Sequence, residues 1–312
     1  MSPFIHTVPN SLTLTRAINE IPPTLTPIRQ LGLFRSEMLS TPFVRIARPK
    51  GPELVRAVPR GAPGQWRPGE TLFFETPKLA LRTVISADEL KPGVVATRLA
   101  QLKEKIELTR ESLQLGALQG KIHGGAGREV LPDIYSPFGL TRKEFSWDLG
   151  TATTHVGKKI SETLTEMKRR YAGETIRGWV CLCSWEFMQA LVYHRSIEAL
   201  YVRFQAGRTY REDETNVEFI HQGIRFIPYQ YDFGNDLKIQ ENEAILLPLG
   251  TKNILVEYFA PADYGETVNT LALPYYAKGM VLEFDKGWEL EAQSNPLPLL
   301  TKPELVATLR AG

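Results

Sequence analysis

The chain has 312 residues, of which 43% are hydrophobic and 23% charged, and its formal net charge at pH 7 is +2. This length allows one large or two ordinary domains, and the nearly balanced charge argues against a strongly cationic nucleic-acid-binding protein. The sequence shows neither a charged and apolar leader at Met1 nor an apolar run long enough to span a bilayer. We therefore expect a soluble protein made in the cytoplasm.

Residues 1–45 are predicted to form an extended arm. Pro3, Pro9, Pro22, Pro23 and Pro27 break any long helix in this segment. Apolar residues nevertheless recur along it, more often than in a disordered tail. Because such a segment cannot form a core of its own, we expect it to lie on the rest of the chain or on a neighbouring molecule.

Residues 42–90 are predicted to form a long hairpin. Partial alternation of apolar residues over 43–48 and 79–85 indicates its two strands, and 59–69 between them is rich in turn formers. Loops of this length are usually functional. Arg56, Arg60 and Arg67, with Trp66 beside them, have the chemistry to contact nucleic acid or a protein surface, and the balanced net charge favours the protein surface.

The strongest predicted helix begins after Gly93 and ends near Gly120. Its apolar residues recur at helical spacing, and at about 1.5 Å per residue it would be roughly 40 Å long. Lys103, Glu107 and other charged residues are expected on its remaining faces, with Lys103–Glu107 as an i,i+4 pair worth a few tenths of a kcal/mol at most.

Shorter elements are predicted along the rest of the chain, and they are grouped rather than regularly alternating, so the fold class is α+β. They are a glycine turn between short strands at 121–131, a helix at 154–171, a buried strand at 179–183, a helix at 185–193, a hairpin at 217–231 around Gly223, and strands at 243–249 and 254–259.

No motif predicts a catalytic, metal or cofactor site. The five histidines form no i,i+3 or i,i+4 pair, and Cys181 and Cys183 complete no zinc pattern with them. Two apart on a strand, these cysteines share a face and are poorly placed for a disulfide. The glycines of 124–127 lack the ending of a phosphate-binding loop, no Gly-x-Ser-x-Gly elbow occurs, and Asp213 and Glu214 lie in a charged loop. Packing on strands is favoured over ligand binding for Tyr275, Tyr276 and Trp288.

Several short stretches, in this order, resemble the lambda-like phage major capsid protein family, also called phage capsid protein E. They are 31–34, 59–63, 115–120, 138–139, 222–226, 258–263, 266–270, 276–278 and 291–297. Each stretch alone is weak, whereas their order and joint spacing over nearly the whole chain are specific.

The resemblance implies the Hong Kong-97-type capsid fold. It divides the chain into an N-terminal arm at 1–45, an extended loop at 46–90, a peripheral domain with a long spine helix at 91–153 and 260–312, and an axial domain at 154–259. Arm and loop are expected to reach neighbouring subunits. The candidate inter-subunit contacts are Phe34, Arg56, Arg60, Trp66, Arg67, Phe73 and Phe74.

The resemblance also implies the function. The protein would be the major capsid protein of a tailed bacteriophage, neither an enzyme nor bound to a cofactor or membrane. It would assemble in the host cytoplasm into hexamers and pentamers that form an icosahedral or prolate head shell around double-stranded DNA. Expected partners are a separate scaffolding protein, a portal and a decoration or cement protein. Lys50 and Lys78 lie away from the tip of the long loop, so no Lys–Asn cross-link between subunits is predicted.

Two alternatives remain open on the sequence. One is an encapsulin-like cellular nanocompartment, which shares the fold but encloses enzyme cargo. The other is a small-molecule enzyme with its site near the glycine turn, which would have to work without a recognisable catalytic constellation.

Overall fold

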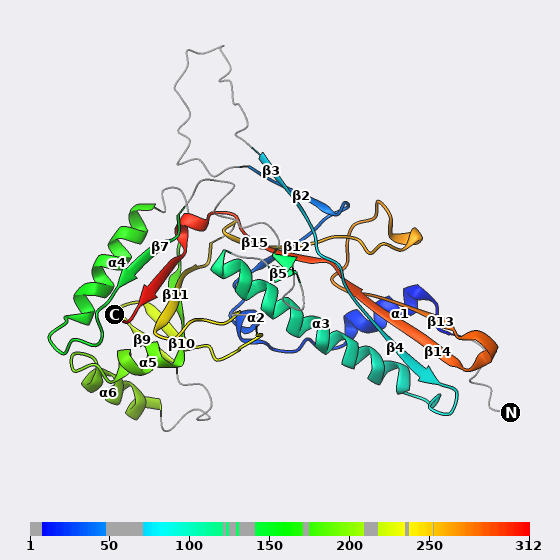
Figure 1. Ribbon diagram of the computed structural model, residues 1–312, viewed down its shortest axis with the longest axis horizontal. Coiled ribbons are helices and arrows are strands. Elements are labelled where there is room, and N and C mark those ends of the chain that lie inside the picture. Colours follow the sequence, from blue (N-terminus) through cyan, green and yellow to red (C-terminus); the bar gives the residue numbers. More distant parts are fainter. Residues whose placement is uncertain are drawn as a thin grey trace, which may run out of the picture.

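The computed structural model describes residues 8–47, 71–120, 123–124, 129–130, 141–170, 175–208, 218–234, 237–251 and 253–312. Helices and strands are grouped along the chain, which confirms the α+β prediction. The molecule is elongated, with a mixed sheet and its helices at one end and a long helix with a narrow sheet at the other (Figure 1). No helix in the described ranges is both long and apolar enough to cross a bilayer.

A six-stranded sheet with the strand order β7-β16-β11-β8-β10-β9 forms the first end of the molecule. Its strands are β7 (Lys143–Ser146), β8 (Gly178–Cys183), β9 (Phe219–His221), β10 (Ile224–Pro228), β11 (Glu243–Leu249) and β16 (Ala307–Arg310), and it is accompanied by the helices α4 (Val156–Arg170), α5 (Trp185–Val192) and α6 (Glu198–Arg208). The predicted strands at 179–183 and 243–249, the hairpin at 217–231 and both predicted helices are confirmed. Cys181 and Cys183 are buried, free thiols on β8.

Trp147 joins the helices to this sheet. Its fully buried indole donates a hydrogen bond to the Thr163 hydroxyl of α4 (3.1 Å) and contacts the rings of Phe187 on α5 and Phe226 on β10. Strands β7 and β16 come from the segments 91–153 and 260–312, yet they belong to this sheet, because β16 pairs with β11 of the segment 154–259 and β7 pairs with β16.

The other end is built on α3 (Val94–Gln119), the predicted long helix. Gly120 ends it in the left-handed conformation (φ 80°), which a residue with a side chain rarely adopts. A three-stranded antiparallel sheet of β13 (Tyr276–Val281), β14 (Gly287–Ser294) and β4 (Leu79–Ser86) packs against α3. Leu99, Leu102 and Ile106 of α3 share a core with Ile85 and Leu290 of that sheet.

The remaining elements are smaller. They are α1 (Ser11–Glu20), α2 (Pro27–Gln30), β1 (Arg35–Met38), β12 (Leu255–Phe259) and β15 (Pro296–Leu300), the short pair β5 (His123–Gly124) and β6 (Glu129–Val130), and the 3-10 turns η2 (Gly265–Thr267), η3 (Glu283–Asp285) and η4 (Pro303–Leu305). Strand β1 pairs with β12 in parallel, and β15 pairs with β12 antiparallel, so residues 35–38 are tied into a central sheet.

The predicted strand pairing of the long hairpin is wrong. Strand β2 (Phe43–Ala47) pairs with β3 (Thr71–Glu75), whereas β4 pairs along its whole length with β14 near the C-terminus. The alternation in 79–85 correctly predicted a strand. However, Ile85 of this strand is buried in the core beneath α3, and this burial places β4 in a different sheet from β2. Residues 48–70, including Arg56, Arg60, Trp66 and Arg67, lie outside the described residues.

Candidate assembly elements

The first element is the N-terminal segment, residues 8–31, which lies on its own chain (Figure 1). Leu14 and Ile18 of α1 are buried in the core shared by α3 and the sheet β13-β14-β4. Asn10 caps α1 by accepting a hydrogen bond from the Thr13 N–H (2.8 Å). The prolines expected to keep this segment extended leave room for a ten-residue helix between Pro9 and Pro22.

Helix α1 also covers the edge of β13. The hydroxyl of Thr15 donates to the Ala277 carbonyl (3.2 Å) and accepts from the Ala277 N–H (3.1 Å), and the Asn19 amide donates to the Tyr275 carbonyl (2.8 Å). Side chains of the helix therefore replace the missing neighbouring strand at these positions. An edge strand left open is a template for unwanted pairing, so the segment protects the sheet as well as packing on it.

Three charged side chains of α3 hold the main chain of this segment. They are Lys103, Glu107 and Glu111, spaced one turn apart, and we call them the α3 stripe. Lys103 Nζ donates to the carbonyls of Ile18 (3.0 Å) and Ile21 (2.6 Å) at the end of α1. These residues lie among the charged residues predicted on the faces of α3 outside its apolar stripe, but they do not face solvent, because each side chain binds the N-terminal segment and is at most 3% exposed.

The two carboxylates of the α3 stripe bind the next residues in order. Glu107 accepts from the Thr24 N–H and pairs with the Arg29 guanidinium (2.7 Å). Glu111 accepts from the Thr26 hydroxyl (2.5 Å) and from the Ile28 N–H at the start of α2 (2.9 Å). The course of the segment is thus fixed through its own backbone and short polar side chains.

The environments of these two carboxylates shift their pKa values in opposite directions. Burial by itself raises the pKa of Glu107, but hydrogen bonds from Thr24 and Tyr275 and the charge of Arg29 outweigh it and hold the pKa below its ordinary value. Burial dominates at Glu111 and raises its pKa, because its partners are neutral donors. Burial likewise lowers the pKa of Lys103.

A buried ion pair fastens α3 to the central sheet. Arg110 contacts both carboxylate oxygens of Glu257 on β12 (2.6 and 3.1 Å) and donates to the Tyr275 hydroxyl. Burial disfavours its charge, but Glu257 and Tyr275 outweigh this, and the pKa of Arg110 is raised. Tyr275 in turn donates to Glu107 (2.8 Å), so the pair and the α3 stripe form one connected network.

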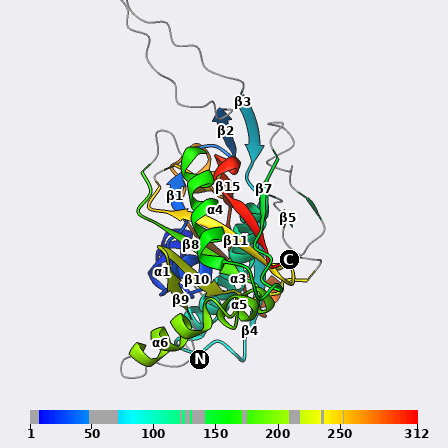
Figure 2. The same ribbon diagram turned by 90° about the vertical axis from the view of Figure 1, so that its left-hand side faces the viewer.

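The second element is the ribbon β2–β3, which stands out from the rest of the molecule in both views (Figures 1 and 2). Its inner face buries Val44, Ile46 and Phe74 in the main core. Its outer face carries Phe43 (55% exposed) and Phe73 (68% exposed), with Arg45 directly opposite Phe73.

The candidate contact residues therefore fall into different surroundings. Phe73 is exposed, Phe74 is buried within its own chain, and Phe34 is half-buried against the main core. Sequence reasoning missed Phe43, although its alternation with the buried Val44 and Ile46 placed it on the same face as Arg45.

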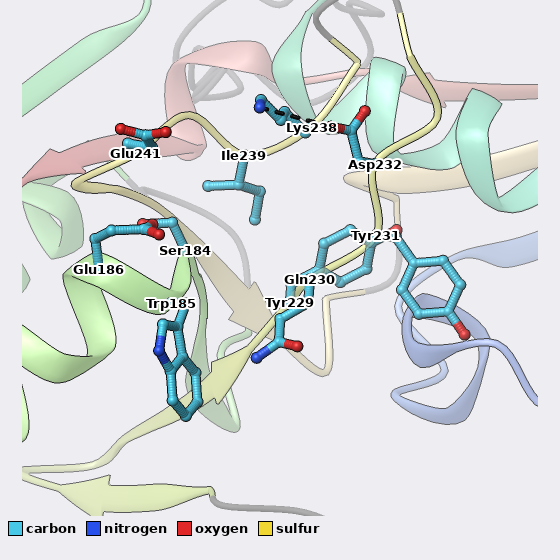
Figure 3. Close-up of a pocket in the computed structure, with 10 residues that line it drawn as sticks. All are labelled: Ser184, Trp185, Glu186, Tyr229, Gln230, Tyr231, Asp232, Lys238, Ile239 and Glu241. Atoms are coloured by element: carbon cyan, nitrogen blue, oxygen red, sulfur yellow. Dashed lines mark ion pairs between the residues drawn. The ribbon is translucent and has the colours of Figure 1, made fainter.

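A hollow of about 230 Å³ lies between α5 and the loops around β10 and β11 (Figure 3). It is lined by Ser184, Trp185, Glu186, Tyr229, Gln230, Tyr231, Asp232, Lys238, Ile239 and Glu241. Ser184 caps α5 by accepting from the Phe187 N–H (3.2 Å), and Asp232 pairs with Lys238 (3.5 Å). These residues offer no nucleophile–base pair. In the ranges that the structure describes, no group of three His, Cys, Asp or Glu side chains could hold a metal ion.

The model of the family described as phage major capsid protein E matches residues 10–91 and 92–311. The chain belongs to this family. Two curated relatives support the assignment, both named major capsid protein. The one from Pseudomonas phage KPP10 is 28% identical over 58% of this chain and 56% of its own length. The one from Salmonella phage Felix O1 is 24% identical over 96% of this chain and 95% of its own. Members of the family are structural proteins of the virion rather than enzymes.

Solved structures confirm the Hong Kong-97-type fold. A protein described as the capsid protein of a prophage in E. coli CFT073 superposes with a TM-score of 0.65 at 14% identity, over 98% of this chain and all of that one. The SrpI encapsulin of Synechococcus elongatus PCC 7942 superposes with a TM-score of 0.51 at 12% identity, over 92% and 88% of the two chains. The encapsulin shares the fold, and the family match decides for the phage protein.

Proposed function

We propose that this major capsid protein forms hexamers and pentamers that close into the head shell of a tailed phage around double-stranded DNA. The family supports shell formation by many copies of one chain. The observation that carries the proposal is the outer face of the ribbon β2–β3, where Phe43, Arg45 and Phe73 are held away from the chain's own core. Aromatic and arginine side chains are the residue types that anchor interfaces.

The contacts of the N-terminal segment and of the ribbon β2–β3 indicate different roles for these two elements. The N-terminal segment buries Leu14, Ile18 and Ile28 within its own chain, so it strengthens the subunit. The ribbon exposes Phe43 and Phe73 on its outer face, so it is the element offered to a neighbouring subunit. Many such contacts around a closed lattice add up, although each one is weak.

The four-part division predicted from the sequence is part of the proposal. An arm at 1–45, a loop at 46–90, a peripheral part at 91–153 and 260–312 and an axial part at 154–259 would move as units during assembly. Strands β7 and β16 join the six-stranded sheet, which favours adding them to the axial part. Separate scaffolding, portal and cement proteins, assembly in the host cytoplasm and a shell free of Lys–Asn cross-links belong to the same proposal.

Electron microscopy of the full chain, co-expressed with its neighbouring head genes, tests this function. We expect closed shells from the natural chain and mostly small particles from the double variant Phe43→Ser, Phe73→Ser. The variant Leu108→Ser, which changes an exposed apolar residue (47% exposed) on α3, is the matched control. If the natural chain, co-expressed with its neighbouring head genes, forms only small particles, the proposal is contradicted. Shells that enclose an enzyme instead of DNA would support the encapsulin-like alternative.

A further inference from the structure

The hollow between α5 and the loops around β10 and β11 has walls that α3 holds in place (Figure 3). The Tyr229 hydroxyl donates a hydrogen bond to Glu111 (3.2 Å), and the Gln119 amide donates to the Lys238 carbonyl (2.6 Å). On the other wall, Ser184 caps α5. The shape of the hollow is therefore fixed before any ligand enters, which lowers the entropic cost of binding.

The hollow carries more negative than positive charge. Its lining includes the carboxylates of Glu186, Asp232 and Glu241 and the ammonium of Lys238. Lys238 already pairs with Asp232 (3.5 Å), whereas Glu186 and Glu241 have no ion-pair partner among the residues that the structure describes. Glu186 lies in the first turn of α5, where the helix dipole favours a carboxylate. Glu241 lies in a turn, where no helix end favours its charge.

Aromatic and apolar side chains form the rest of the wall. Trp185 is 43% exposed and Tyr231 is 39% exposed, while Tyr229 and Ile239 are buried. Trp185 and Glu186 come from α5 on one side of the hollow, opposite Tyr229 from the loop after β10 (Figure 3). Aromatic faces attract cations, so rings and carboxylates in one hollow favour the same kind of ligand.

The chemistry of the lining selects an organic cation. The carboxylates would repel an anion, and an apolar ligand would remove water from Glu186 and Glu241 without replacing it. A metal ion needs several ligating side chains, and within the described ranges no group of three His, Cys, Asp or Glu side chains could hold one. The volume of about 230 Å³ is below the roughly 300–1,000 Å³ of sites for drug-sized molecules, so it suits a single side chain.

We propose that this hollow binds an alkyl guanidinium group, as carried by an arginine side chain of another protein chain. The planar group offers five N–H donors to the carboxylates of Glu186 and Glu241 and a flat face to the Trp185 indole. A lysine ammonium has the charge but not the plane, so we expect it to bind more weakly. The inference goes beyond the proposed shell function and does not depend on it.

Agmatine, a free alkyl guanidinium, tests the site on the isolated subunit. We expect a saturable change in tryptophan fluorescence with a Kd of about 1–10 mM, and we expect this change to disappear in Trp185→Phe. Butylurea, which has a similar shape but no charge, should give no saturable change over the same concentrations. Equal affinity for the two probes, or no saturation with agmatine, would overturn the proposal.

Charge-neutral substitutions test the two carboxylates. The pair Glu186→Gln, Glu241→Gln should raise the Kd for agmatine about tenfold or more, because it removes the charge-assisted hydrogen bonds. The pair Glu198→Gln, Glu283→Gln makes the same change in net charge at exposed glutamates outside the hollow, and it should leave the Kd unchanged. An equal effect of both pairs would mean that only the overall charge attracts the probe, and the proposed site would be wrong.

A cross-linking experiment identifies the source of the guanidinium group. The photo-reactive residue p-benzoylphenylalanine replaces Gln230, an exposed residue of the lining, in chains co-expressed with the neighbouring head genes. We expect mass spectrometry to find a cross-linked peptide with an arginine next to the attached residue. A cross-linked peptide without arginine would overturn the assignment. So would the absence of any cross-link together with a small guanidine or amine released from denatured particles, which would make the ligand a free molecule.

Discussion

The N-terminal segment and the ribbon β2–β3 are both apolar segments outside the main sheets, but they use their apolar residues differently. Ile18 and Ile28 of the segment are completely buried in their own chain, whereas the ribbon buries one face and exposes Phe43 and Phe73 on the other. The difference teaches that apolar content alone does not say whether a segment packs within a subunit or between subunits.

The two regions differ in which groups form hydrogen bonds with their backbone N–H and carbonyl groups. The α3 stripe satisfies N–H and carbonyl groups of the N-terminal segment one turn after another. The ribbon's two strands satisfy each other, so its outer face needs no partner for the subunit to fold. A region held by buried polar contacts belongs to the subunit, and a self-paired ribbon is free to serve a neighbour.

Adjacent phenylalanines in β3 provide the largest expected contrast. Phe74→Ala should lower the free energy of unfolding by about 3–5 kcal/mol, since the buried ring leaves a cavity in the core. Phe73→Ala should change it by about 0.5 kcal/mol or less, because the ring is already in solvent. Urea unfolding of the subunit measures both. Similar losses for the two variants would show that the ribbon's faces are not distinct.

The same contrast within α1 tests whether the N-terminal segment belongs to the subunit. Ile18→Ala should cost about 2–5 kcal/mol of unfolding free energy, because the side chain is fully buried. Leu12→Ala on the same helix is the matched control, since Leu12 is 81% exposed. If both variants unfold like the natural chain, the segment does not contribute to the stability of the free subunit.

Removing one carboxylate of the α3 stripe should have a smaller, local effect. Glu107→Ala leaves the Thr24 N–H and Arg29 without their acceptor, which we expect to cost about 1–3 kcal/mol. Glu104→Ala on the exposed side of α3 should cost almost nothing. Hydrogen exchange should accelerate at residues 8–31 in the first variant only. Equal exchange in the two variants would mean that apolar packing alone holds the segment.

The sequence predicted most of the elements, because their signals are local. The helix 94–119 was visible from its periodicity and its closing Gly120, and the buried strand 178–183 from its unbroken apolar run. The family resemblance supplied the fold that these elements build.

The contacts of the charged residues of α3 could not be predicted from local sequence patterns. Lys103, Glu107 and Glu111 look like the solvated face of an amphipathic helix, and only the distant residues 18–28 reveal them as buried. The pairing of β4 with β14 likewise joins residues about 200 positions apart in sequence, for which a hairpin pattern gives no signal.

The smallest expected effect distinguishes the two carboxylates of the α3 stripe by the sign of their pH dependence. The folded-state pKa of Glu107 is lowered, so its contribution to stability is present above the ordinary pKa of Glu and is lost as the pH falls through the lowered value. The folded-state pKa of Glu111 is raised, so its contribution is present below the ordinary pKa and is lost as the pH rises through the raised value.

Unfolding free energies of Glu107→Gln and Glu111→Gln between about pH 3 and pH 6 test this difference. The advantage of the natural chain over Glu107→Gln should grow as the pH rises, and its advantage over Glu111→Gln should shrink. Slopes of the same sign would contradict the assignment of Thr24, Tyr275 and Arg29 as the cause of the lowered pKa of Glu107, of which the ion pair with Arg29 distinguishes it from Glu111, a carboxylate that also accepts from a tyrosine hydroxyl. Opposite slopes would show that two carboxylates one turn apart hold the same segment by different means, one through charge and the other through neutral donors at a cost in desolvation.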